Sequence, residues 1–177
     1  MADINIKEQV NFERESFFEA FRDKAEELDI HLPDVDSIEN LEREEVDENT
    51  IKVVNHWKAS GDQVPKALRS FIKPDMLSWK EHATYDKNKW ASQFSIEPDH
   101  LKEAINCEGK ITFEEKGNNE TEVTIDAKLK IDASKIPGVP KLGSGKISKT
   151  IEDFAVPMIS SNLSEYVKAV KSYLESQ

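Results

Sequence analysis

Among the side chains that could do chemistry, Glu81 occupies the most informative position. Leu77, Trp79, Ala83 and Tyr85 alternate around it with the period of a β-strand, so strict alternation directs its carboxyl group to the same face. Burial disfavours a charged carboxylate and raises its pKa, which suits a general acid or an anchor for a polar ligand group. The alternatives are a bulge that turns Glu81 outward and a basic partner near the rim of the sheet.

The cysteine and the histidines offer less chemistry. Cys107 falls on an inward strand position, where a small buried hydrophobic residue has its ordinary place, and catalysis would require a nearby histidine. The four histidines lack the spacing of metal ligands, although His56 and His82 occupy polar positions of neighbouring strands and are expected on the outer surface. We therefore predict no catalytic residue, no metal site and no cofactor.

Two other segments lack the sequence patterns of a phosphate-binding loop and of a calcium-binding loop. Gly145-Lys146 resembles the end of a phosphate-binding loop, but Pro140 stands where the first glycine of that loop is needed. The acidic run from Glu39 to Glu48 lacks the spacing of an EF-hand loop. A solvated strand face or loop accounts for this run.

Composition restricts the classes of function. The 177 residues fit one domain, so we expect a single domain over residues 1–177. The net charge of −11 argues against nucleic-acid binding, which needs a basic surface, and predicts repulsion from anionic membranes. No apolar run approaches the ~18 residues of a membrane span, so no stable membrane insertion is expected. One cysteine and an N-terminus without a secretory signal predict a cytoplasmic setting.

The elements that position these residues follow from the apolar periodicity. Alternation predicts strands over residues 4–12, 38–46, 50–59, 77–85, 90–96, 105–113 and 123–131, as in an antiparallel sheet with one covered face. Helical spacing predicts helices over residues 17–28 and 67–72, and a long one from Lys146 to the C-terminus. Pro157 lies within the last helix and removes one backbone donor, which predicts a kink there or a helix that begins near it.

Three passages resemble a known superfamily: residues 90–98 followed by 105–109, the hairpin 110–131, and residues 140–147 leading into the last helix. They are similar to the START / Bet v 1 / polyketide-cyclase-like (SRPBCC) superfamily, and closest to an uncharacterised bacterial family of lipid-transport and cyclase-like proteins. The resemblance implies an α+β helix-grip fold, in which a curved antiparallel sheet wraps around the long C-terminal helix. It also implies an apolar cavity between sheet and helix, used in the superfamily for lipids, sterols, polyketides or quinones. The superfamily has no invariant catalytic set, so no catalytic residue is carried over.

The facing apolar stripes of sheet and helix are either plain core or the walls of that cavity. If they are walls, alternation predicts these ligand-binding residues: Asn55, Trp57, Trp79, Glu81, Tyr85, Trp90, Ser92, Phe94, Phe154, Met158 and Tyr166. The predicted function is binding or transport of an apolar or amphipathic small molecule, such as a lipid, a quinone or a polyketide-like compound. One alternative is a cyclase- or hydrolase-like enzyme of the same fold, with Glu81 or Cys107 as its ionisable group. Another is a ligand-free interaction module whose acidic face recruits a basic protein.

Overall fold

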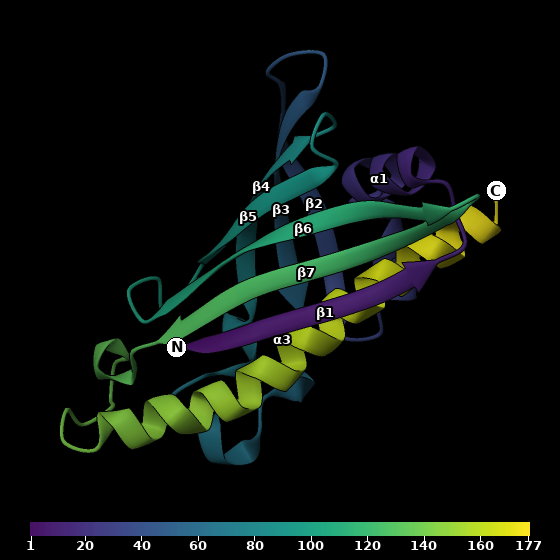
Figure 1. Ribbon diagram of the computed structural model, residues 1–177. Coiled ribbons are helices and arrows are strands. Elements are labelled where there is room, and N and C mark those ends of the chain that lie inside the picture. Colours follow the sequence, from purple (N-terminus) through teal and green to yellow (C-terminus); the bar gives the residue numbers. More distant parts are fainter.

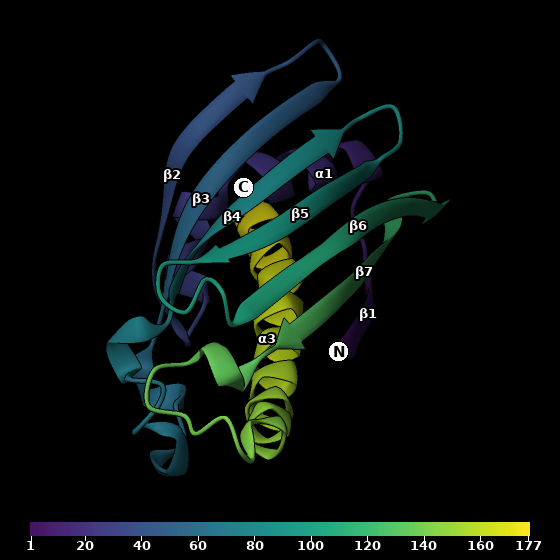
Figure 2. The ribbon, with the colours of Figure 1, turned by 90° about the vertical axis from the view of Figure 1, so that its left-hand side faces the viewer.

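Seven antiparallel strands form one curved sheet around a long helix in the computed structural model, which describes residues 1–177 (Figure 1 and Figure 2). The spatial order is β1-β7-β6-β5-β4-β3-β2, so successive strands pair with each other and β1 joins beside β7. The strands are β1 (Ala2–Val10), β2 (Val35–Glu45), β3 (Thr50–Ala59), β4 (Ser78–Asp86), β5 (Ala91–Pro98), β6 (Ile105–Gly117) and β7 (Glu120–Ile131). This architecture confirms the α+β helix-grip prediction.

The concave face of the sheet carries the core. On β7, Val123, Ile125, Ala127 and Leu129 are buried, while the residues between them are more exposed, as expected when one face is covered and the other meets water. Two groups of helices cover the concave face. Their different positions leave one end of it packed and the other end hollow.

The N-terminal helices fill the packed end. The helix predicted over residues 17–28 is divided at Lys24 into α1 (Arg14–Asp23) and α2 (Ala25–Leu28), followed by the 3-10 turn η1 (Asp29–His31). The Phe18 ring of α1 lies edge-on to the rings of Tyr85, Trp90 and Phe113, with centroid distances of 5.8, 5.3 and 5.1 Å. Edge-to-face aromatic pairs are favourable, so this cluster fixes α1 on the sheet.

The C-terminal helix α3 (Ser144–Glu175) crosses the whole concave face and forms the other cover. It is continuous through Pro157, so the alternative of a helix that begins near this proline is wrong. Figure 1 shows α3 changing direction near its middle. Pro157 has no N–H to donate to the preceding turn, which is an ordinary cause of such a bend.

Apart from the β1–β2 connection, which contains α1 and α2, the longer connections lie at the end of the molecule where α3 begins. There, the segment between β3 and β4 contains the 3-10 turns η2 (Gly61–Gln63), η3 (Lys66–Leu68) and η4 (Pro74–Met76), in place of the predicted helix over residues 67–72. Pro65 and Pro74 interrupt regular helix formation in this segment. The turn η5 (Ala133–Lys135) and a loop connect β7 to α3.

Candidate functional site

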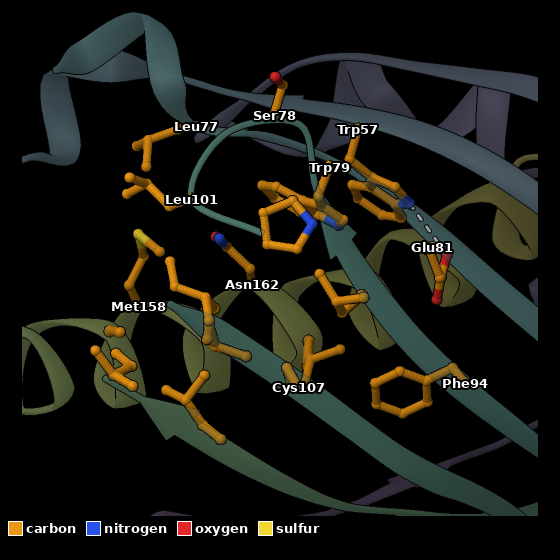
Figure 3. Close-up of a pocket in the computed structure, with 18 of the residues that line it drawn as sticks. Trp57, Leu77, Ser78, Trp79, Glu81, Phe94, Leu101, Cys107, Met158 and Asn162 are labelled. Carbon is orange, nitrogen blue, oxygen red and sulfur yellow. Dashed lines mark hydrogen bonds between the residues drawn. The ribbon is translucent and has the colours of Figure 1, made fainter. Parts of the chain in front are cut away.

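A cavity of about 180 Å³ lies between the concave face of the sheet and α3 (Figure 3). It is lined by 27 residues, of which 22 are hydrophobic. Strands β4 to β7, the η4 region, the β5–β6 connection and α3 all contribute to its wall. The apolar faces of the sheet and of α3 therefore do not form a completely filled core, because they line this space.

One wall is a pair of stacked indoles. Trp57 on β3 lies directly opposite Trp79 on β4, and their rings are nearly parallel, at 7°, with centroids 6.0 Å apart. Figure 3 shows Leu77, Leu101 and Met158 toward one end of the cavity and Glu81 and Phe94 toward the other. The cavity thus has a mainly apolar end near the η4 region, where Asn162 also lies, and an end that contains a carboxyl group.

Glu81 lies on the cavity wall, as strict alternation predicted. Pairing of β4 with both neighbouring strands is regular, so there is no bulge to turn Glu81 outward, and no salt bridge reaches its carboxyl group. The Trp57 indole Nε1 donates a hydrogen bond of 3.0 Å to Glu81 Oε2. Burial raises the pKa of Glu81, and the hydrogen bonds from Trp57 and Asn55 offset only part of that shift. Both the bulge and the basic partner are therefore wrong as explanations of this residue.

Two phenols share the polar end with Glu81. The Tyr166 hydroxyl on α3 donates a hydrogen bond of 2.8 Å to the Phe21 carbonyl of α1. Burial raises the pKa of both Tyr85 and Tyr166 well above the ordinary value of a phenol, and the charge of Glu81 adds to the shift. Both phenols are therefore neutral at physiological pH, and the polar end carries no positive charge.

Most of the predicted site residues line the cavity: Trp57, Trp79, Glu81, Tyr85, Phe94, Phe154, Met158 and Tyr166. Asn55, Trp90 and Ser92 do not. Asn55 is buried and accepts a hydrogen bond of 2.9 Å from Asn40 on β2. Ser92 is 1% exposed and its hydroxyl has no hydrogen-bond partner.

Trp90 departs from the prediction because α1 occupies its part of the concave face. Its ring packs against Phe18, and the Arg14 guanidinium lies 4.4 Å from the ring centroid. Its φ of 48° also places it in the turn before β5, where strand alternation has not begun. The spacing of residues in the sequence does not show how much of the sheet the N-terminal helix covers.

Several lining residues escaped the sequence prediction. Ile111 on β6 and Leu129 on β7 lie at inward positions of their strands. The alternation of apolar residues in these strands could have identified them. Ile72, Met76 and Leu101 come from irregular segments that have no period, so nothing in the sequence marked them as wall residues. They close the apolar end.

Cys107 lines the cavity but is not activated. Burial raises the pKa of its thiol to about 11, so the thiolate required for nucleophilic attack is scarce at neutral pH. His56 and His82 do not contact each other: His56 pairs with Asp99 at 2.5 Å and His82 with Glu97 at 2.9 Å. No group of three or more histidine, cysteine or acidic side chains lies close enough together to hold a metal ion.

The sheet and its closing helix define the START-like helix-grip fold, and comparison with solved structures supports that fold. Zhui aromatase/cyclase from Streptomyces sp. R1128 has a TM-score of 0.64 at 13% identity, covering 98% of this chain and 93% of that chain. Norcoclaurine synthase from Thalictrum flavum has a TM-score of 0.64 at 12% identity, over 99% and 87%. A START superfamily protein from Mycobacterium smegmatis has a TM-score of 0.56 at 11% identity, over 98% and 97%. Likenesses at this level of identity establish the fold alone.

The sequence itself belongs to a family described as a protein of unknown function (DUF2505), whose model matches residues 6–171. No match was found among curated proteins. None of the helices has the length and apolar character needed to cross a membrane.

Proposed function

We propose that this protein binds an apolar or amphipathic small molecule, of lipid, quinone or polyketide-like character, in the cavity between the sheet and α3. The observation that carries the proposal is the mainly hydrophobic lining of that cavity, which contains only a few polar groups, among them Glu81. Small-molecule sites are commonly concave and apolar, with a few polar groups that orient the ligand. The single buried cysteine is consistent with the further proposal of a reducing, cytoplasmic setting.

The energetics of an empty cavity support an occupant. At about 24 cal/mol per Å³, a void of about 180 Å³ costs on the order of 4 kcal/mol of stability. Proteins of this size have a total stability of about 5–15 kcal/mol, so the cost is a large part of the whole. A ligand that fills the space with apolar atoms recovers that free energy.

The polar end defines the orientation of an amphipathic ligand. Glu81 Oε2 accepts the hydrogen bond from Trp57, and Asn55 also lies beside the carboxyl group. A carboxyl group of raised pKa donates and accepts hydrogen bonds when protonated, and no lysine or arginine lines the cavity to attract an anion. We expect the ligand to place a neutral hydroxyl or carbonyl group beside Glu81 and its apolar body along the stacked tryptophans.

A second candidate is a cyclase- or hydrolase-like enzyme, which the raised pKa of Glu81 favours because it suits a general acid. Two of the structural neighbours are named as an aromatase/cyclase and a synthase, and those activities are theirs. The variant Glu81→Gln separates the two functions, because glutamine still accepts the Trp57 hydrogen bond but cannot supply an acid. Turnover that this variant abolishes, with ligand binding retained, would indicate the enzyme.

Filling the cavity tests the binding function. Ala155 on α3 lines the cavity, so Ala155→Leu projects three additional carbon atoms into it. We expect at least a tenfold loss of affinity for 1-naphthol, menadione and palmitic acid, measured by native mass spectrometry and fluorescence titration. The free variant should be as stable as the wild type or more so, because cavity filling is stabilising.

The neighbouring substitution Val156→Leu is the matched control, because Val156 contacts the core without lining the cavity. It should bind the three probes with wild-type affinity. Equal affinity of wild type, Ala155→Leu and Val156→Leu would place any binding outside the cavity. No binding of any probe class by the wild type would argue against the proposed function.

A further inference from the structure

Two stretches of the chain contain no acidic residue, although the protein has 35 acidic residues in 177. Residues 63–74 contain Lys66, Arg69 and Lys73, and residues 133–151 contain Lys135, Lys141, Lys146 and Lys149. In a chain with a net charge of −11, these stretches concentrate positive charge. We call the two together the basic end.

The two stretches are neighbours in the fold, because both lie at the end of the molecule where α3 begins (Figure 1 and Figure 2). The hairpin of β2 and β3 lies at the opposite end. Residues 39–48 of that hairpin carry six acidic side chains and one basic side chain. The charges are therefore separated along the long axis of the molecule.

The basic side chains are available for a partner. All seven belong to exposed residues, and only Lys149 forms a salt bridge, with Asp153 on the same helix. Basic residues elsewhere are often paired, as Lys87 is with Glu15 and Glu19. The other six form no salt bridge, although Asp62, Asp75, Asp132 and Glu152 border the two stretches.

An apolar side chain projects from the same end. Leu142 is 95% exposed, in the loop between Gly138 and Gly143, and both glycines have a positive φ that favours glycine. Residues 63–74 also supply Ile72 to the apolar end of the cavity. The basic end therefore combines unpaired charge, a protruding leucine and the nearby cavity.

We propose that the basic end docks on the surface of an anionic lipid membrane, which places the apolar end of the cavity near the bilayer. Clusters of lysine and arginine bind anionic lipid surfaces, and an exposed leucine gains free energy from contact with the acyl region. The net charge predicted repulsion, but it describes the whole chain. At an ionic strength of 0.1 M charges are screened beyond about 10 Å, so the acidic hairpin at the far end opposes docking only weakly.

A lipid surface fits this end better than nucleic acid or an acidic protein. Neither of those partners explains the protruding Leu142, and nucleic acid would be served by exposed aromatic side chains for stacking, which this end lacks. The choice of lipid also depends in part on the proposed function, because an apolar ligand must enter or leave through an apolar phase. Membrane binding itself is measured without any ligand in the cavity, so the two proposals fail separately.

Co-sedimentation of the full chain with vesicles tests the docking. We expect binding to vesicles of phosphatidylcholine with phosphatidylglycerol, none to phosphatidylcholine alone, and loss of binding as salt is raised to 0.5 M. The triple variant Lys135→Gln, Lys141→Gln, Lys146→Gln should weaken binding at least about tenfold. Leu142→Ser should weaken it by a smaller factor that stays the same at every salt concentration at which binding is still measurable.

The matched control neutralises Lys52, Lys80 and Lys110 on the sheet, which also form no salt bridge, and changes the net charge equally. It should bind anionic vesicles within about twofold of the wild type. Equal loss in both triple variants, or no binding to anionic vesicles, would overturn the proposal. Binding to a duplex RNA oligonucleotide, with the same dependence on the three lysines and without vesicle binding, would also overturn it.

Discussion

At the scale of single residues, the Glu81 carboxyl group is held where ionisation is unfavourable. It lies on an apolar cavity wall, accepts one indole hydrogen bond and has no cationic partner. Its pKa in the folded protein is raised by burial above the value of about 4.3 for an exposed glutamate. Folding therefore favours the protonated form of Glu81 over the charged form.

This preference predicts how stability changes with pH in Glu81→Gln. Because the folded pKa is raised, the contribution of Glu81 is fully present below the unfolded pKa and is lost as pH rises through the folded pKa. We therefore expect Glu81→Gln to gain stability relative to the wild type as pH increases above about 4.3. Urea denaturation at several pH values measures the difference.

Comparing Glu81→Gln with the wild type isolates the ionisation of Glu81. Glutamine still accepts the hydrogen bond from Trp57, but its side chain cannot lose a proton. Glu44→Gln on the exposed edge of β2 is the control, because it removes one carboxylate outside the cavity. If the difference in unfolding free energy between Glu81→Gln and the wild type does not change with pH, the fold does not favour the neutral form of Glu81.

At the scale of elements, the close packing of β5 against β6 depends on Gly109. This residue lies opposite Phe94 on β5 and Ala127 on β7. A Cβ atom at position 109 would come within 2.7 Å of the Phe94 ring, 2.8 Å of Ala127 Cβ and 2.6 Å of the Asp126 carbonyl oxygen. The glycine therefore provides the space for the Phe94 ring, which is part of the cavity wall.

We expect Gly109→Ala to destabilise the protein by about 1–3 kcal/mol, as overpacked core substitutions do. Displacement of Phe94 should also weaken binding of the 1-naphthol probe. Gly145→Ala is the control: no atom lies within 4 Å of its added methyl group, and alanine favours the helix, so its stability should be unchanged or slightly higher. Chemical denaturation of the two variants provides the comparison. Similar stability of both would show that the sheet accommodates a side chain at position 109.

Sequence reasoning succeeded for elements with a strong period. The alternation of Val123 to Ile131 and the stripe along α3 identified the sheet and its closing helix, because one covered face imposes a regular pattern. It failed where packing between distant elements decides the outcome. Trp90 lies under α1 rather than in the cavity, and Ile72 reaches the cavity from an irregular segment, and neither position follows from local spacing.

At the scale of the whole molecule, the N-terminal helices pack one end of the sheet and leave a cavity under α3 at the other. Tyr166 connects the two parts, since its hydroxyl binds the Phe21 carbonyl of α1 while its ring lines the cavity. Its ring also lies edge-on to Phe21, at 4.7 Å. Occupancy of the cavity and stability of the fold are therefore linked through contacts that extend to α1.

This linkage predicts a lower melting temperature after any bound molecule is removed. A ligand at about 100 times its Kd stabilises by about 2.7 kcal/mol, which for a domain of this size corresponds to roughly 5–10 °C in Tm. We expect protein purified from cells to melt that much higher than the same protein stripped on a hydrophobic resin, measured by calorimetry. The difference should shrink in Ala155→Leu, because its cavity is partly filled. Equal melting temperatures, with no ligand mass in the native mass spectrum before stripping, would indicate that the purified protein carries an empty cavity.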